Sequence, residues 1–149
     1  MLQTVEHEKA AARQKVEEPM RVLLVDDEEL VRLSTGRVLR YKGHDVVDAS
    51  DGRQALRLYG EQRPDIVMLD IDMPGLSGQE TLVALLELDP EAVVIMITGH
   101  TDPKQARALC ELGAQSLLGK PWSLAELMDA IETATKPRPA VAAPSGPAD

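Results

Sequence analysis

The sequence is poor in the residues that many kinds of site require. Its 149 residues include no phenylalanine, aromatic residues at only 2% of positions, and a single cysteine, Cys110, which excludes an internal disulfide and a cysteine-based zinc site. Residues 1–19 lack the apolar core of a signal peptide, and no stretch approaches the ~20 apolar residues that cross a bilayer. We therefore expect neither secretion nor membrane insertion, and we predict a cytoplasmic protein.

Basic side chains are also scarce. Lys and Arg number 16 against 25 Asp and Glu, which gives a net charge of −9. A surface this acidic repels nucleic-acid phosphates and anionic lipid headgroups, and no run of Lys and Arg provides a local exception. The charge balance therefore predicts that the protein binds neither nucleic acid nor membrane.

The middle of the chain differs from both ends. Residues 136–149 contain four prolines and no apolar periodicity, which is typical of a disordered tail. In residues 1–19 a few apolar positions alternate at three- and four-residue spacing, which predicts a flexible or helical arm. The remaining residues, 20–135, have the usual size of one domain. The tail is too short for an output domain of ~60 residues, so we expect a stand-alone domain or a fragment of a larger protein.

Apolar runs alternate with segments of helical periodicity five times. Three of these runs are continuously apolar, as strands buried on both faces must be, and two weaker ones fit edge strands. The three are Val22–Val25, Ile66–Leu69 and Val93–Ile97, and the weaker two are Asp45–Ala49 and Ser116–Gly119. The alternation predicts an α/β fold, with five helices on the two faces of a doubly wound, five-stranded parallel sheet. The strand order 2-1-3-4-5 places the weaker strands at the edges.

Local signals mark where the later helices begin. Asp102 followed by Pro103 is typical of a capped helix start, and Ser123 with Glu126 forms a capping-box pattern. Cys110 follows the apolar side of the helix that begins at Pro103, so we expect it to pack in the core rather than act as a reactive thiol.

Polar residues stand at the carboxyl ends of four of the predicted strands. They are Asp26–Asp27, Asp70, Thr98–Gly99 and Lys120–Pro121. These strands are neighbours in the predicted order and run parallel. Three carboxylates, a hydroxyl and an ammonium are therefore expected to converge where the strands end, along the carboxyl-terminal side of the sheet. Clustered carboxylates repel one another unless a cation is present, and few hard oxygen ligands favour Mg²⁺. The set suits phosphoryl transfer, with a carboxylate as the nucleophile.

These motifs resemble the receiver domain of two-component response regulators, a family with a flavodoxin-like fold. The resemblance runs from Arg21 to about Thr135. It rests on V-L-L-V-D-D-E, I-V-M-L-D-I-D-M-P-G, V-V-I-M-I-T-G-H and L-L-G-K-P-W, in this order at the ends of predicted strands. It implies that the protein accepts a phosphoryl group from a sensor histidine kinase or a phosphotransfer protein and then changes how it binds a partner.

The resemblance also assigns roles at the predicted site. Asp70 would become the acyl phosphate, without the protein acting as an enzyme on another substrate. Asp27 and Asp70 would ligate Mg²⁺, or Mn²⁺, directly, while Asp26 would hold the metal through water and the backbone carbonyl of Asp72 would be a further ligand. Lys120 would pair with the Asp70 carboxylate and later with the phosphoryl group.

The remaining roles concern the conformational switch. Thr98, followed by Gly99, would move to bind a phosphoryl oxygen. Leu117 stands where the family has an aromatic residue, so a leucine rotamer change would have to report on Thr98. Pro121 is expected in cis, and Trp122 replaces a more usual phenylalanine beside the site. An unknown protein partner would read the fourth helix, fifth strand and fifth helix, and the protein would be a monomer or a phosphorylation-dependent dimer.

Two alternatives remain open. The first is a binding module that keeps the fold and works without phosphorylation, for which Leu117 is the only support. The second is a phosphatase resembling the haloacid-dehalogenase family, because Asp70-Ile71-Asp72 matches its Asp-x-Asp motif. In that family the motif lies on the first strand and the acidic pair comes late, whereas here the order is reversed.

Overall fold

Strands and helices alternate along the part of the chain that the computed structural model describes, residues 19–99 and 102–135. The predicted arm, except for Pro19, and the predicted tail lie outside these residues. The strands are β1 (Arg21–Val25), β2 (Asp45–Ala49), β3 (Ile66–Asp70), β4 (Val94–Thr98) and β5 (Ser116–Gly119). The helices are α2 (Glu29–Tyr41), α3 (Gly52–Gln62), α4 (Gly78–Leu88), α5 (Pro103–Leu112) and α6 (Leu124–Thr135). No helix in the described ranges is long and apolar enough to cross a membrane.

The five strands form one parallel sheet in the order β2-β1-β3-β4-β5, which confirms the predicted topology. Every residue of β3 and β4 is buried, as their continuous apolar sequences require. The weaker strands, β2 and β5, lie at the two edges with the bounds that the sequence predicted. The predicted fourth run is displaced by one residue, because the strand begins at Val94 and the partly buried Val93 contributes only its carbonyl, which accepts a hydrogen bond from the Val67 amide.

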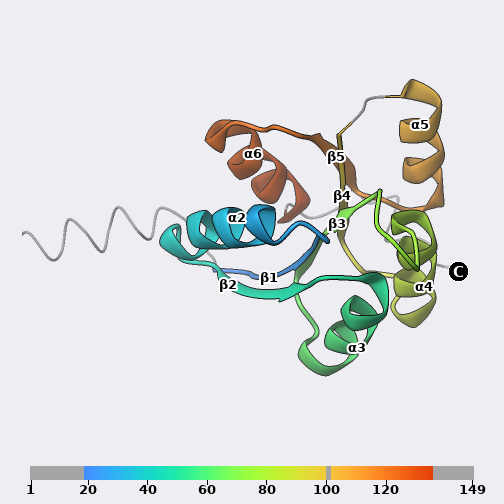
Figure 1. Ribbon diagram of the computed structural model, residues 1–149, viewed down its shortest axis with the longest axis horizontal. Helices are drawn as coiled ribbons and strands as arrows, with labels where there is room; N and C mark the ends of the chain where they lie inside the picture. Colours follow the sequence, from blue (N-terminus) through green and yellow to red (C-terminus); the bar gives the residue numbers. More distant parts are fainter. Residues whose placement is uncertain (1–18, 100–101, 136–149) are drawn as a thin grey trace, which may run out of the picture.

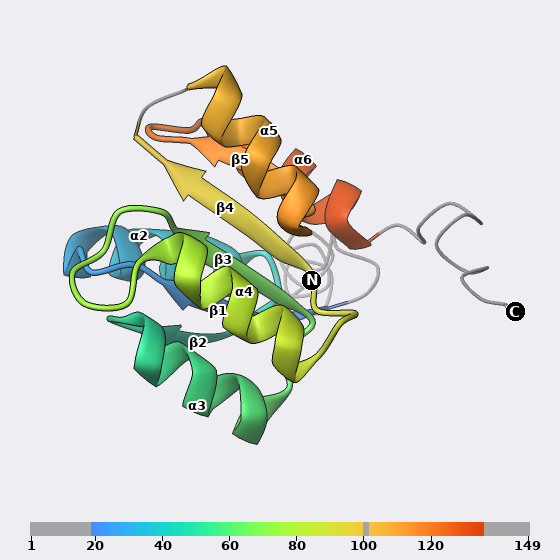
Figure 2. The same cartoon turned by 90° about the vertical axis from the view of Figure 1, so that its right-hand side faces the viewer.

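Helices cover both faces of the sheet (Figures 1 and 2). On one face α2 and α6 bury Leu39, Leu127 and Ile131 against the sheet. On the other face α3, α4 and α5 enclose a second apolar cluster, to which α5 contributes Leu109. Helices therefore cover both faces of the sheet. Polar residues can gather along the carboxyl edge, by which we mean the side of the sheet where the carboxyl ends of the parallel strands lie.

The predicted helix starts are confirmed, whereas the prediction for Cys110 is wrong. Asp102 caps α5 by accepting a hydrogen bond from the amide of Lys104, with Pro103 as the first helical residue. Cys110 is exposed, because successive residues lie roughly 100° apart around a helix and the buried position on α5 is its neighbour Leu109.

The capping box of α6 offers a test of local stability. Ser123 Oγ accepts a hydrogen bond of 3.1 Å from the Glu126 amide, and Glu126 Oε1 accepts one of 2.8 Å from the Ser123 amide. Ser123→Ala is expected to lower the free energy of unfolding by about 1 kcal/mol, because the Glu126 amide loses its side-chain acceptor at the start of the helix. Urea unfolding would measure this. The control Ser34→Ala, inside α2, should cost little, and equal losses in the two variants would contradict the prediction.

Candidate functional site

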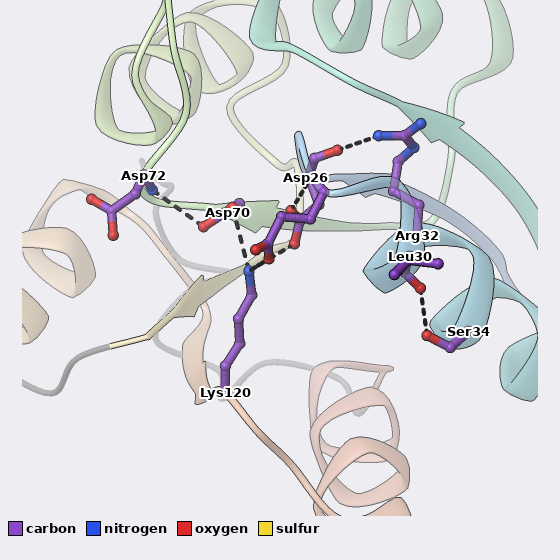
Figure 3. A network of polar contacts seen from close by, with 8 residues as sticks. Asp26, Leu30, Arg32, Ser34, Asp70, Asp72 and Lys120 are labelled. Carbon is purple, nitrogen blue, oxygen red and sulfur yellow. Dashed lines mark hydrogen bonds and ion pairs between the residues drawn. The ribbon is translucent and has the colours of Figure 1, made fainter.

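The carboxyl edge of the sheet brings the predicted site residues together (Figure 3). Asp26 directly follows β1, Asp70 and Thr98 are the last residues of β3 and β4, and Lys120 follows β5. Backbone hydrogen bonds fix these strand ends, including a 2.7 Å bond from the Lys120 amide to the Thr98 carbonyl. The convergence predicted from the strand order is therefore present in the structure.

Three carboxylates form the acidic part of the site. Oxygens of Asp26, Asp27 and Asp70 lie within 4.8 Å of one another. Asp26 and Asp70 are buried, whereas Asp27 is exposed. Asp26 Oδ1 accepts a 2.9 Å hydrogen bond from the Glu28 amide, and Asp70 Oδ1 accepts one of 3.2 Å from the Asp72 amide. Each buried carboxylate is thus oriented by the loop that follows its own strand.

Lys120 is the cation of the site, and Figure 3 shows its side chain extended towards Asp26 and Asp70. Its Nζ lies 3.0 Å from Asp26 Oδ2, 3.0 Å from Glu28 Oε1 and 3.5 Å from Asp70 Oδ2. The ammonium therefore bridges two buried carboxylates and one exposed carboxylate. One positive charge among four nearby carboxylates still leaves the site acidic.

The pKa values in the site follow from burial and charge. Burial raises the pKa of Asp70 to about 7, with repulsion from Asp26 adding to it, while Lys120 and the Asp72 amide act in the opposite direction. Burial alone would lower the pKa of Lys120, but its hydrogen bond to Glu28 and the charges of Asp26 and Asp70 outweigh this effect, so its pKa lies above the ordinary value. Lys120 therefore remains charged, whereas ionised Asp70 is destabilised.

The acidic cluster is suited to a divalent cation. Its donors are carboxylate oxygens, the ligands that hard cations such as Mg²⁺ prefer. Asp26 Oδ2 is buried and accepts no well-aligned hydrogen bond from the described residues, although it is ion-paired with Lys120. A second positive charge would therefore relieve both the repulsion and this poorly bonded oxygen.

The other predicted residues surround this cluster. Asp72 is exposed, and in Figure 3 its carboxylate points away from Asp70, so its backbone is the part that faces the site. Thr98 is buried and Gly99 is exposed at the end of β4. Leu117 is partly buried against the cluster of α3, α4 and α5, where it pairs with Met96 in the sheet.

A cavity of about 350 Å³ lies beside the site, between α2 and α6. Lys120, Pro121 and Trp122 line it together with apolar residues of both helices. The Lys120–Pro121 peptide bond is cis, as predicted. Trp122 is partly buried against the α2 and α6 side of the core, so it contributes to both the core and the cavity wall.

The start of α4 packs closely against the end of β3. Its first residue, Gly78, lies so close to the backbone of Asp70 and Ile71 that a Cβ atom would collide with it, and its amide donates a 3.0 Å hydrogen bond to the Ile71 carbonyl. Glycine is therefore required here for steric reasons. The loop that carries Asp72 is held against the site by this contact.

Sequence reasoning missed Glu28 as a site residue. The sequence places it directly after the acidic pair, which is the one signal that could have identified it. Its ion pair with Lys120 joins residues 92 positions apart, and no local pattern specifies such a contact.

Comparisons with known proteins agree with this geometry. A family model described as the response regulator receiver domain matches residues 22–132. The transcriptional regulatory protein PrrA of Mycobacterium tuberculosis is 38% identical over 125 residues, covering 84% of this chain and 54% of PrrA. Sporulation initiation phosphotransferase F of Bacillus subtilis is 32% identical over 112 residues, covering 75% of this chain and 90% of the relative. The chain thus spans about half the length of the PrrA relatives.

Solved structures share the fold. The chain resembles one in the crystal structure of a CheX–CheY–BeF3–Mg²⁺ complex from Borrelia burgdorferi with a TM-score of 0.77 and 29% identity. The alignment covers 80% of this chain and 91% of that chain. The similarity therefore extends over nearly all of the described residues.

Proposed function

This chain belongs to the response regulator receiver domain family, and from that membership we propose that it accepts a phosphoryl group on Asp70 and thereby switches its binding to a partner. The observation that carries the proposal is the position of Asp70. It is a buried carboxylate at the carboxyl edge of the sheet, 3.5 Å from the Lys120 ammonium and grouped with two further carboxylates. Such a group combines a nucleophile with a cation that can neutralise phosphoryl oxygens.

In the proposed reaction an oxygen of ionised Asp70 attacks the phosphorus of a phosphohistidine. The new bond joins this oxygen to phosphorus, and the bond from phosphorus to the imidazole nitrogen breaks with its electron pair remaining on the nitrogen. Asp26, Asp27 and Asp70, with the Asp72 carbonyl, would hold Mg²⁺ or Mn²⁺, which supplies neutralisation of phosphoryl charge when bound. Lys120 would bind a phosphoryl oxygen.

The switch is proposed to pass through β4. Phosphorylation adds about −1.5 to −2 charges and three acceptor oxygens, to which the buried Thr98 hydroxyl can donate. Movement of Thr98 and Gly99 would rearrange the start of α5. Leu117 on the neighbouring strand would report the movement, so α5, β5 and α6 form the proposed readout face.

Several assignments accompany this proposal. The phosphoryl source would be a histidine kinase or a phosphotransfer protein in the cytoplasm, and the output partner a protein rather than nucleic acid or membrane. Residues 1–19 and 136–149 would flank a receiver of residues 20–135, as an arm and a tail. The protein would act as a monomer or as a phosphorylation-dependent dimer, and not as an enzyme on another substrate.

Intact-mass analysis tests the proposal. Incubation with acetyl phosphate and Mg²⁺ is expected to add one phosphoryl group, and the product should disappear when EDTA replaces Mg²⁺. Asp70→Asn should abolish the addition. The control Asp72→Asn should retain it, because the exposed Asp72 side chain points away from the site.

The two alternatives give different results in the same experiment. Steady consumption of the donor without an increment on the protein would favour a phosphatase or a switch whose phosphoryl group is very short-lived. No increment and no donor consumption would favour a phosphorylation-independent binding module. Addition that persists in Asp70→Asn would overturn the assignment of the acceptor.

A further inference from the structure

Glu28 stands at the mouth of the site and contacts its cation. Its Oε1 lies 3.0 Å from Lys120 Nζ, as close as the buried Asp26 carboxylate. The Glu28 side chain is 60% exposed, whereas those of Asp26 and Asp70 are 3% and 5% exposed. Of the three carboxylates around the ammonium, Glu28 is therefore the one that can move freely into solvent.

The backbone directs Glu28 to this place. Its amide donates to Asp26 Oδ1, and its carbonyl accepts a 3.1 Å hydrogen bond from the Arg32 amide in the first turn of α2. Glu28 occupies the N-cap position of α2, yet its side chain makes no capping hydrogen bond. The carboxylate therefore pairs with Lys120 instead of the helix, while the main chain is fixed from both directions.

We propose that Glu28 is a positioning residue that restrains phosphoryl transfer to Asp70 by occupying Lys120 and by repelling the anionic donor. This inference rests on the proposed function. An ammonium has three N–H donors, and three carboxylates surround that of Lys120. A phosphoryl oxygen that arrives at Asp70 competes with these carboxylates for the ammonium. The contact that opens is the one with Glu28, because its side chain alone can be solvated without rearranging the core.

The charge of Glu28 acts on the donor as well. A phosphoryl donor must approach through the exposed side of the site, where Glu28 adds a negative charge next to Asp27. Both effects, the occupation of Lys120 and the repulsion of the donor, involve an exposed charge. Interactions of an exposed charge are weak, so we expect a combined change in rate of about threefold to fivefold. Glu28 therefore restrains the reaction without abolishing it.

The test measures phosphorylation of the full chain at sub-saturating donor with Mg²⁺. Glu28→Gln is expected to react about fivefold faster than the wild type with acetyl phosphate, a dianion. The gain should be smaller with phosphoramidate, which carries less negative charge, and should shrink as salt is added. Glu28→Asp, which keeps the charge, should return towards the wild-type rate. The matched control is Glu29→Gln, which removes an exposed carboxylate from the first turn of α2 and should leave the rate unchanged.

A binding measurement separates positioning from turnover. Trp122 lines the same cavity as Lys120, so its fluorescence can follow titration with beryllium fluoride, an analogue of the phosphoryl group, in the presence of Mg²⁺. Glu28→Gln should bind the analogue a few-fold more tightly than the wild type, and Glu29→Gln should not.

The outcomes distinguish this inference from the proposed function. If the wild type gains a phosphoryl group but Glu28→Gln reacts no faster and binds beryllium fluoride no more tightly, the role of Glu28 is overturned while the function stands. An equal gain in Glu29→Gln would also overturn it, because the effect would then come from general charge at the start of α2. A wild type that neither gains a phosphoryl group nor consumes the donor overturns the proposed function, and this inference with it.

Discussion

Replacing Asp70 with asparagine is expected to raise the free energy of unfolding by on the order of 3 kcal/mol at about pH 8 without divalent cations. The pKa of Asp70 is raised from 3.8 to about 7 in the folded protein, chiefly by burial and then by Asp26. The folded state therefore holds a proton more tightly than the unfolded state. Ionisation of Asp70 lowers the free energy of unfolding progressively as the pH rises from about 4 to about 7. Above that range the lowering stays at its full size. Asparagine carries no charge at any of these pH values.

Urea unfolding of both proteins in EDTA at several pH values would measure this effect. The gain in Asp70→Asn should be near zero at about pH 4 and largest at about pH 8. Added Mg²⁺ should stabilise the wild type more than the variant, because the variant has lost one carboxylate of the cluster. Asp72→Asn, on the exposed side chain of the same loop, should show no such pH-dependent gain. An equal gain for Asp70→Asn at both pH values would contradict the electrostatic explanation.

The arrangement of the sheet was predictable because it depends on local signals. Continuous apolar runs identify β3 and β4 as central strands, and the weaker patterns of β2 and β5 identify the edges. The one-residue error at β4 has a physical cause. Val93 is apolar and its carbonyl accepts a hydrogen bond from the Val67 amide, so an apolar run alone does not show that the paired strand begins one residue later, at Val94.

The composition of the site was predictable for a related reason. The carboxyl ends of parallel strands meet at one edge, so residues that end adjacent strands must lie close together once the order is known. The same reasoning could not specify side-chain contacts. Lys120 could have paired with any carboxylate at that end of the sheet, and its shorter contacts, with Asp26 and Glu28 rather than Asp70, depend on burial and on the first turn of α2. The exposure of Cys110 was missed for a comparable reason, because it depends on how α5 is rotated against the sheet.

Lys120→Met is expected to have the opposite effect to Asp70→Asn and to lower the free energy of unfolding by about 2–4 kcal/mol at about pH 8 in EDTA. Methionine retains much of the apolar stem, so the main change is the loss of the ammonium. Asp26 and Asp70, both buried, then lose their cation. Because Lys120 opposes the upward shift in the pKa of Asp70, its removal should raise that pKa further and steepen the loss of stability as the pH rises.

A double-mutant cycle shows whether this cost arises from the carboxylates. In the Asp70→Asn background Lys120→Met should cost clearly less than in the wild type, because one of the buried charges that it would leave unpaired is already absent. Lys104→Met, on an exposed lysine of α5, controls for the loss of a positive charge in general. An equal cost of Lys120→Met in both backgrounds would mean that Lys120 stabilises the protein independently of Asp70. The coupled result would instead mean that a single ammonium holds the acidic cluster together in the metal-free protein, and that adding Mg²⁺ should restore stability to the Lys120→Met variant.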